Sequence, residues 1–544
     1  HPSSAIRKFI YLNILNDPCM KRIGLTSLFF VSILLIHSCQ QPNAPTVADY
    51  HYLEEITLQQ LQTGYQQGSF TIEKVVADYL KRIEDLDKAG PGLNSIMYVN
   101  PKAIEVARQL DQELKDGKSR GPLHGIPILL KDNIDTHDMP TTAGATVLRG
   151  SYPPSDSYLT KKLRDAGAVI IGKANLSEWA NFRGDMSSSG WSGMLGQTKN
   201  PYVLDRNPCG SSSGSGVAAA ANLCAIAIGT ETNGSIVCPS NNNGLVGLKP
   251  TVGLVSRTGI IPISATQDTA GPMARTVTDV AITLGALVGV DSADQRTLAS
   301  SGNYVKDYTP YLKADGLRGK RIGLLKKDLG YHARVDSLMK KVVADLKSQG
   351  AEVIELDYSM EGKINGSSFT VMLYEFKDGL TKYFASLGNK ARVKDLNELM
   401  EFNKKDSIEL RYFDQNLLKL AHEKGTLEDK EYKEALAAML KATRDDGIDK
   451  LLKENKLDAL MAPTGSPAWK TDLINGDHFM GGSSSLAAIS GYPAITVPMG
   501  FIDELPVGVS FFSKAWSEPL LIEIAYAYEQ STKHRKAPKF IPSN

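Results

Sequence analysis

Three segments of the chain each carry one residue that could take part in nucleophilic chemistry. Lys131 stands in GIPILLKDN (125–133), Ser211 in CGSSSG (209–214) and Ser235 in GTETNGSI (229–236). A serine hydroxyl attacks a carbonyl group poorly unless a base removes its proton, and a lysine amine can be that base only when it is uncharged. Together the three residues predict a Ser-Ser-Lys catalytic triad.

The apolar run before Lys131 suits this role, because burial of a lysine side chain disfavours its charged form. A free lysine titrates near ~10.4, so holding its amine uncharged at pH 7 costs about 4 to 5 kcal/mol. Desolvation behind Ile128, Leu129 and Leu130 could supply this free energy. A buried strand that merely ends in Lys131 is an alternative that fits the same residues.

Other interpretations of these segments are weaker. Gly and Ser clusters are usually turns or loops. Residues 210–216 lack the Lys-Ser/Thr pair of a phosphate-binding loop, which disfavours that kind of site. A histidine base is also disfavoured, because none of the nine histidines lies in the Gly/Ser segments, and His124 and His137 beside Lys131 are expected to be structural.

Longer stretches around these residues resemble the amidase signature family, whose members share a Gly/Ser-rich core and a Ser-(cis-Ser)-Lys triad. Further matching stretches are GLVGLKPT (244–251), DTAGPMAR (268–275), GYPAITVP (491–498) and LPVG (505–508). Others resemble the bacterial peptide amidases within that family, namely KANLSEWANFRG (173–184), SGWS (189–192), GTET (229–232) and PTVGLVSR (250–257). The resemblance implies an amidase, a serine hydrolase that cleaves carboxamide C–N bonds through an acyl-enzyme and releases ammonia, with peptide C-terminal amides as expected substrates.

The resemblance also assigns roles to the three residues. It makes Ser235 the nucleophile, Ser211 the bridging serine after a cis peptide bond, and Lys131 the base. The backbone N–H groups of Thr232, Asn233, Gly234 and Ser235 are expected to form the oxyanion hole. Asn233 departs from the commoner Gly-Gly-Ser pattern, so the donor geometry depends on the conformation of this residue, and Val237 replaces a frequent arginine at the pocket floor.

Four residues between the first two catalytic segments are candidates for lining the substrate pocket: Trp179, Phe182, Arg183 and Trp191. Buried core positions are the alternative for such side chains. A small amide or an amidated peptide is the expected partner. No cofactor is implied, and no cluster of residues with metal-ligand spacing is present in the sequence.

The resemblance implies an α/β fold, the amidase signature fold, with a large mixed and twisted β-sheet covered by helices on both faces. Periodicity predicts that residues 58–83 are helical, with Thr71 as the N-cap of a helix whose apolar positions run from Val75 to Ile83, and it predicts buried strands at 169–172 and 225–229. Residues 51–544 are expected to form a single amidase domain with a signature core at about 125–290. A variable helical region at about 300–457 should contain strands at 321–325 and 353–356 around a helix at 332–349.

Composition agrees with a large enzyme. The chain has 544 residues, of which 42% are hydrophobic and 22% charged, so it can bury a sizeable core. The formal net charge is +1, and no basic stretch carries interleaved aromatic residues. Nucleic-acid binding is therefore not expected.

The amino-terminal segment predicts export. Residues 1–19 resemble an upstream extension, and Met20-Lys21-Arg22 followed by the apolar residues 23–36 is typical of a signal peptide. Cys39, which begins a polar linker over 39–50, resembles the lipid-carrying cysteine of a bacterial lipoprotein, although His37 is atypical and ordinary signal cleavage remains an alternative. The expected location is thus the periplasm or a membrane anchor, through lipid on Cys39, in a bacterial envelope.

The state of the other cysteines stays open at this stage. A bridge between Cys209 and Cys238 is conceivable in an exported protein, but the sequence does not fix the distance between them. Buried free thiols are the preferred expectation for Cys209, Cys224 and Cys238.

Two other functions compete with a peptide amidase. The first is an amidotransferase A-type subunit that supplies ammonia to a partner enzyme, which the predicted export disfavours. The second is a non-catalytic envelope lipoprotein that binds peptides in a hydrolase-like cleft. The presence of Lys131, Ser211 and Ser235 disfavours the second. Neither the oligomeric state nor the acyl-side specificity follows from the sequence.

Overall fold

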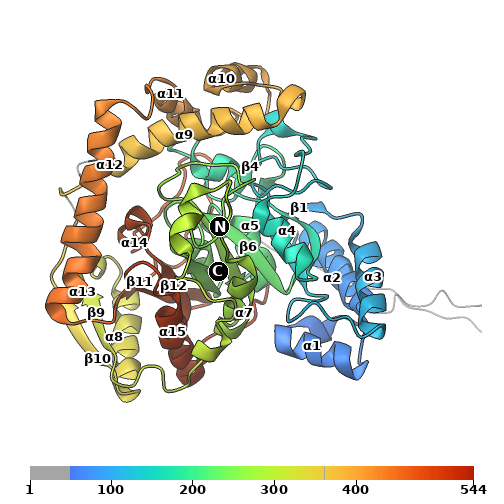
Figure 1. The fold of residues 1–544 in the computed structure, drawn as a ribbon, viewed down its shortest axis with the longest axis horizontal. Helices are drawn as coiled ribbons and strands as arrows, with labels where there is room; N and C mark the ends of the chain where they lie inside the picture. Colours follow the sequence, from blue (N-terminus) through green and yellow to red (C-terminus); the bar gives the residue numbers. More distant parts are fainter. Residues whose placement is uncertain (1–48, 361, 365, 544) are drawn as a thin grey trace, which may run out of the picture. The chain divides into compact units, whose positions relative to one another are not determined.

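Apolar runs of the sequence form a large mixed sheet in the computed structural model, which describes residues 49–360, 362–364 and 366–543 (Figure 1). The strands are β1 Ile96–Val99, β2 Pro127–Lys131, β3 Val169–Ala174, β4 Trp191–Ser192, β5 Gly196–Gln197, β6 Ile226–Glu231, β7 Val246–Lys249, β8 Thr269–Ala274, β9 Arg321–Leu325, β10 Glu352–Leu356, β11 Ala459–Pro463, β12 Ala494–Ile502 and β13 Leu505–Phe512. The order in the sheet is β1-β3-β2-β6-β8-β7-β12-β13-β11-β9-β10, and β4 pairs separately with β5.

The strands nearest to the predicted site are β2, β3 and β6. β2 pairs in parallel with both neighbours, and every residue of the three strands is buried. Parallel strands covered on both faces form continuous apolar runs, because neither face meets water. The buried strands expected at 169–172 and 225–229 are therefore confirmed as β3 and β6.

Helices pack against the sheet in two groups. The helices are α1 Leu58–Gln67, α2 Ile72–Ile83, α3 Ala103–Lys115, α4 Tyr158–Asp165, α5 Ser213–Ala220, α6 Val237–Asn242, α7 Val277–Leu287, α8 Ala333–Ser348, α9 Ser367–Ser386, α10 Leu396–Lys405, α11 Asn416–His422, α12 Lys430–Thr443, α13 Asp449–Asn455, α14 Ser485–Ser490 and α15 Glu518–Thr532. α15 contacts α7, α8 and the sheet, whereas α5 and α6 contact each other and the sheet. The expected α/β fold with a mixed sheet covered on both faces is confirmed.

The helical character expected over residues 58–83 and the cap expected at Thr71 are confirmed, and the structure divides this stretch into the two helices α1 and α2. α1 ends at Gly68, whose φ of 69° lies in the left-handed region that glycine adopts readily at helix ends. Thr71 then caps α2, because its hydroxyl accepts a hydrogen bond from the N–H of Lys74 at 3.0 Å. Apolar positions lie on one face of both helices, so periodicity alone did not reveal the break.

The variable region extends the sheet and adds outer helices. The expected strands at 321–325 and 353–356 are β9 and β10, which pair in parallel at the edge of the sheet. The expected helix between them is α8, with His332 as its cap. α9 packs on α11 and α12, and these helices, gold to orange in Figure 1, run along the periphery.

The topology brings the predicted catalytic segments together. β2 ends at Lys131 and β6 ends at Glu231, and the carboxyl ends of these neighbouring parallel strands meet at one edge. Ser211 precedes α5, which contacts β2, β3 and β6, and Ser235 lies in the loop after β6. The site must therefore form around the carboxyl end of β6.

Residues Ala48–Asn544 form one compact unit. The predictions made for residues 1–48, which concern the upstream extension, the signal peptide and Cys39, lie outside the described residues. Within the part of the chain that the structure describes, no helix combines the length and the apolar character needed to cross a membrane.

Candidate active site

Lys131 is fully buried at the end of β2. Its Nζ donates hydrogen bonds to Ser211 Oγ at 2.7 Å, to Thr230 Oγ1 at 2.8 Å and to the Thr230 carbonyl oxygen at 3.3 Å. Burial lowers the pKa of Lys131 to about 7, and the negative charges of Asp268 and Glu231 oppose this shift only in part. A large fraction of this lysine is therefore uncharged near neutral pH.

The carboxylate next to Lys131 in the sequence faces another cation. Asp132 lies 3.3 Å from the Nζ of Lys173 and accepts a hydrogen bond from the hydroxyl of Thr142. Successive residues of a strand point to opposite faces, so Asp132 turns away from the amine of Lys131. Among the described residues, no carboxylate lies within 4.0 Å of that amine. Its hydrogen-bond partners are uncharged oxygens.

Ser211 follows a cis peptide bond from Gly210, as the family resemblance implies. Its side chain is fully buried, and its carbonyl oxygen accepts a hydrogen bond from the N–H of Ser177 at 3.1 Å. A Cβ atom at residue 210 would lie 2.2 Å from the Oγ of Ser177, which only glycine avoids. The close packing of these two segments fixes the backbone that presents Ser211 to Lys131.

Ser235 lies beside this segment and is partly exposed. Its carbonyl oxygen accepts a hydrogen bond from the N–H of Ser212 at 3.2 Å. The carboxylate of Glu231 accepts hydrogen bonds from the N–H groups of Ile236 and Val237, at 2.8 and 3.0 Å. The loop that carries Ser235 is thus held both to the Ser211 segment and to the end of β6.

In the loop expected to form the oxyanion hole, Asn233 does not need the left-handed backbone conformation that was considered for it from the sequence. Gly234, not Asn233, adopts the left-handed conformation, with φ +87°. Within the described chain, no residue accepts a hydrogen bond from the backbone N–H groups of Asn233, Gly234 and Ser235. The side chain of Asn233 instead bonds to the hydroxyls of Ser484 and Ser485, at 2.7 and 3.2 Å. Asparagine at this position therefore does not disturb the turn.

Sequence reasoning missed several residues that hold the site. Thr230 receives two hydrogen bonds from Lys131 and one more from the amide of Asn133 at 3.0 Å. Ser212 Oγ donates to the Thr230 carbonyl and accepts from its N–H, at 2.9 and 3.1 Å. These residues lie within the motifs themselves, but neither their type nor their spacing indicated which partner each would have.

Cys209 and Cys238 form a disulfide bond, which corrects the expectation of free thiols at these two positions. Cys209 lies two residues before Ser211 and Cys238 three residues after Ser235, so the bond joins the two serine segments. Their Cα atoms are 5.9 Å apart, within the range of native disulfides. The structure brings the two cysteines together through the packing of α6 and the 209–214 segment. Cys224 is free and buried, as expected.

A cavity of about 500 Å³ opens beside the Ser235 loop. Its lining combines residues around the two serines with the 184–189 segment and the loop between β11 and α14: Asn181, Gly184, Asp185, Met186, Ser187, Ser189, Cys209, Gly210, Asn233, Gly234, Val237, Cys238, Thr464, Trp469, Asn475, Gly476, Asp477, Phe479, Gly482, Ser484 and Ser485. Val237 is part of this lining, consistent with its expected position at the pocket floor.

The four residues predicted to line the pocket, three aromatic residues and one arginine, are buried and are not among these lining residues. Trp179 packs edge-on against Phe384, and Phe182 against Phe376. Arg183 forms a buried ion pair with Glu178, and Trp191 packs edge-on against Tyr412 and Phe413. Large apolar side chains here pack against the helices of the variable region, so their neighbours Asn181, Gly184 and Met186 line the cavity instead.

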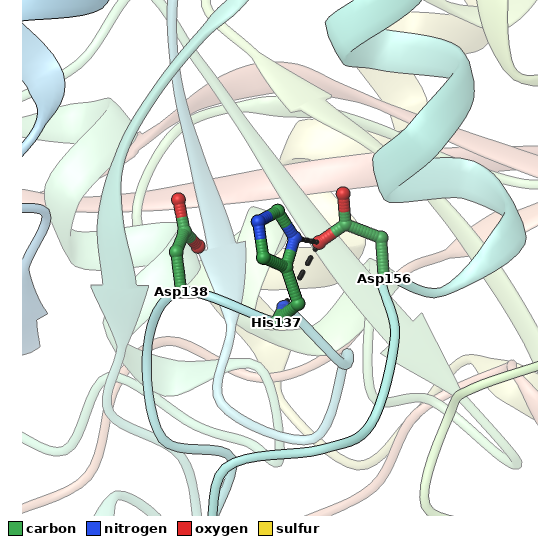
Figure 2. A group of neighbouring side chains, drawn as sticks. All are labelled: His137, Asp138 and Asp156. Carbon is green, nitrogen blue, oxygen red and sulfur yellow. Dashed lines mark hydrogen bonds and ion pairs between the residues drawn. The ribbon is translucent and has the colours of Figure 1, made fainter.

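His137, Asp138 and Asp156 form a polar cluster (Figure 2). His137 Nδ1 lies 2.9 Å from Asp156 Oδ1. The guanidinium of Arg164 forms ion pairs with both carboxylates, at 2.8 and 3.0 Å. This cation is already engaged by both carboxylates and offsets part of their negative charge, so we assign the cluster a structural role. His124 bonds to backbone groups of Leu110 and Arg120 and is also structural.

Comparison with known proteins defines the family. The amidase family model matches residues 74–522. The chain belongs to the amidase family. It is 39% identical to a probable amidase of Arabidopsis thaliana over 94% of this chain and 97% of that protein. It is also 32% identical to the A-type subunit of the glutamyl-tRNA(Gln) amidotransferase of Methanosarcina acetivorans, over 86% of this chain and 95% of that protein.

This amidase is also similar to solved structures of peptide amidases. The peptide amidase of Stenotrophomonas maltophilia is 49% identical, with a TM-score of 0.86, over 89% of this chain and 99% of that one. A peptide amidase in complex with the competitive inhibitor chymostatin is 50% identical, with a TM-score of 0.87, over 89% of this chain and 99% of that one. The predicted resemblance to peptide amidases is thereby confirmed.

The expected location in a bacterial envelope is wrong. Probable and putative amidases that match at 36 to 39% identity come from Arabidopsis thaliana, Schizosaccharomyces pombe and Arthroderma benhamiae, which are eukaryotes. The features that suggested a lipoprotein were a short apolar run and the single residue Cys39. These residues lie outside the described part of the chain, and the relatives named above give no support for a signal peptide or membrane attachment.

Replacing both Cys209 and Cys238 with serine should lower the free energy of unfolding by about 3 to 4 kcal/mol, because the bond closes a loop of 29 residues in the unfolded chain. Urea denaturation without reductant measures this difference. Peptide mapping of the wild-type protein should yield a linked Cys209–Cys238 peptide. Recovery of both cysteines as free thiols from unreduced protein would contradict the assignment.

Glu231→Ala should reduce kcat by roughly 10- to 100-fold and also lower the unfolding temperature, because the Ser235 loop loses two hydrogen bonds that fix its geometry and two buried N–H groups lose their acceptor. Glu231→Gln is the matched variant, since it keeps an acceptor oxygen and removes only the charge. That charge favours protonated Lys131, so the glutamine variant should retain most of kcat while the pH at which activity rises moves lower. Equal losses of activity in both variants would argue against a positioning role for the hydrogen bonds.

Proposed function

We propose that this amidase hydrolyses the C-terminal carboxamide of peptides, with Ser235 as nucleophile, Ser211 as proton relay and Lys131 as general base. The observation that carries the proposal is the buried amine of Lys131, whose pKa is lowered to about 7 and which lies 2.7 Å from Ser211 Oγ. The hydrogen bond between Ser212 and the Ser235 carbonyl keeps the nucleophile segment next to that relay.

In acylation, Ser235 Oγ forms a bond to the carbonyl carbon of the amide. The Ser235 proton moves to Ser211 Oγ while the Ser211 proton moves to Lys131 Nζ. When the tetrahedral intermediate collapses, the C–N bond breaks and Lys131 returns the proton through Ser211 to the departing nitrogen, which leaves as ammonia. No net charge is transferred to solvent in this half-reaction.

In deacylation, a water oxygen bonds to the ester carbonyl carbon and its proton follows the same route to Lys131. Collapse breaks the bond to Ser235 Oγ, and the proton returns to that oxygen. The product is a peptide with a free carboxylate. Each half-reaction leaves Lys131 uncharged, which is why a lowered pKa at this lysine suits the chemistry.

The negative charge on the tetrahedral oxygen requires hydrogen-bond donors. We assign this role to the backbone N–H groups of Thr232, Asn233, Gly234 and Ser235. Those of the last three have no acceptor within the described chain and are therefore available to substrate. Loss of one such donor typically lowers the rate by about 100- to 1000-fold.

The peptide part of the proposal rests on two observations. This chain resembles peptide amidases at about half identity along nearly their whole length, and one of those enzymes is inhibited competitively by chymostatin. The cavity beside Ser235 has a volume of about 500 Å³, which falls within the range of small-molecule sites and is large enough for a short peptide.

A component of a tRNA-dependent amidotransferase is the second candidate, favoured by the 32% identity to the Methanosarcina acetivorans protein. The higher identity to peptide amidases makes it the weaker one. Release of ammonia from an amidated peptide by this chain alone would favour the first function. Activity only in a complex with a partner protein would favour the second. The non-catalytic lipoprotein has no support from the comparisons and is not retained.

Ser235→Ala should lower kcat for an amidated dipeptide by at least about 1000-fold, because no other hydroxyl replaces the nucleophile. Ammonia release measures activity, and a fluorophosphonate probe should label the wild-type protein but not the variant. Ser337→Ala, which changes an exposed serine of α8, should leave both results unchanged. A Ser235→Ala protein with full activity would exclude this nucleophile.

The pH dependence of kcat should follow the ionisation of Lys131. Below a pKa of about 7 the amine is protonated and cannot accept the proton from Ser211, so kcat should rise with increasing pH through about 7 and then level off. Ammonia release measured at saturating peptide amide between about pH 5 and 9 tests this. A rise centred near ~4 would instead indicate a carboxylate base.

A further inference from the structure

Two large apolar side chains at the cavity mouth are exposed to an unusual degree. Met186 is 56% exposed and Phe479 is 52% exposed, and both line the cavity beside Ser235. Exposed apolar groups that gather at a cavity are typical of ligand-binding surfaces, whereas scattered ones need no explanation. The catalytic residues do not explain why these two apolar side chains are exposed at the cavity.

We infer that Met186 and Phe479 form an apolar subsite that binds an apolar side chain of the peptide amide. The inference rests on the proposed function and names the class of peptide that it would favour. Burial of the substrate side chain between these two residues would remove apolar surface from water on all three partners.

Phe479 is held in place within an otherwise irregular loop. Residues 464–484 connect β11 to α14 over more than a dozen residues without a helix or a strand of the main sheet, and such long loops in compact domains are often binding loops. The ring of Phe479 packs edge-on against Trp469, with centroids 5.8 Å apart. The indole N–H of Trp469 donates to Asp477 Oδ1 at 3.2 Å. Phe479 is thus fixed although it is exposed.

Met186 belongs to a segment that the same loop contacts. Asp477 accepts hydrogen bonds from the N–H and hydroxyl of Ser189, at 3.0 and 2.5 Å. A Cβ atom at residue 476 would lie 3.0 Å from the carbonyl oxygen of Met186, so glycine allows the loop to approach this segment closely. The two apolar residues therefore belong to one continuous wall.

That wall reaches the proposed oxyanion loop. Ser484, at the end of the same irregular segment, and Ser485, the first residue of α14, bond to the side chain of Asn233. A substrate whose carbonyl oxygen lies at the backbone N–H groups of residues 233–235 would therefore extend along the wall toward Phe479. The subsite is adjacent to the scissile bond and not a separate docking surface.

The charge of the lining favours an uncharged or cationic occupant. The described lining residues include Asp185 and Asp477 but no lysine, arginine or histidine. Asp477 is engaged by Ser189 and Trp469, whereas the side chain of Asp185 is exposed. A peptide amide carries no carboxylate at its C-terminus, while the product does, so the lining should bind the substrate better than the product.

Steady-state kinetics with N-acetyl-leucinamide and N-acetyl-glycinamide test the subsite, because the two substrates differ only in the side chain. Phe479→Ala and Met186→Ala should each lower kcat/KM for the leucine substrate by about 5- to 10-fold, mainly through KM, and change the glycine substrate less than about twofold. Ile474→Ala is the matched control, since this residue of the same loop is 79% exposed and does not line the described cavities. Ile474→Ala should leave the ratio of kcat/KM for the leucine substrate to kcat/KM for the glycine substrate unchanged.

Equal losses for both substrates, or the same change of ratio in Ile474→Ala, would overturn the inference. Calorimetric binding of N-acetyl-leucinamide to the Ser235→Ala protein separates the subsite from catalysis. Weaker binding after Phe479→Ala in that background would support the subsite even if the wild-type protein released no ammonia, an outcome that would refute only the proposed function. Unchanged binding in that background would overturn the subsite.

Discussion

The structure depends on the burial of one lysine amine among uncharged oxygens. Lys131 Nζ lies within hydrogen-bond distance of the hydroxyls of Ser211 and Thr230 and of a backbone carbonyl, while the neighbouring carboxylate of Asp132 pairs with Lys173. If Asp132 faced Lys131, it would stabilise the ammonium form and the amine would not serve as a base at neutral pH. Placing β2 between two parallel strands, buried on both faces, creates this environment.

The second constraint is the fixing of two glycine-rich segments that would otherwise be mobile. Ser211 stands in a segment packed against Ser177, and the Ser235 loop is held by the carboxylate of Glu231. The Cys209–Cys238 bond then joins both segments covalently. The proposed proton relay would require two serine segments whose separation changes little, and these three contacts hold the segments together.

The sequence predicted the elements that depend on local pattern. The buried strands β3 and β6 and the α8 helix with its two flanking strands agree with the structure, whereas the cis bond before Ser211 was implied by the family resemblance. The cap of α2 at Thr71 was predicted, whereas the end of α1 at Gly68 was not, because residues 58–83 all have helical character. The family resemblance, not periodicity, supplied the overall sheet architecture.

Contacts between residues far apart in sequence could not be predicted. Asn233 bonds to Ser484, and Ser189 bonds to Asp477, although more than two hundred residues separate each pair. Hydrophobic packing against the variable region removed Trp179 from the cavity that it was expected to line. The lining of the cavity beside Ser235 includes residues from such pairs, so residue types near each motif did not reveal the cavity.

The central claim is that burial lowers the pKa of Lys131 to about 7, so that a large fraction of its amine is uncharged at neutral pH, and nuclear magnetic resonance measures this directly. In protein labelled with lysine carrying ¹³C at Cε, the Lys131 resonance is identified by its absence from a Lys131→Met variant. We expect that resonance to titrate with a pKa of about 7. Titration near ~10.4, the value of a free lysine, would contradict the account.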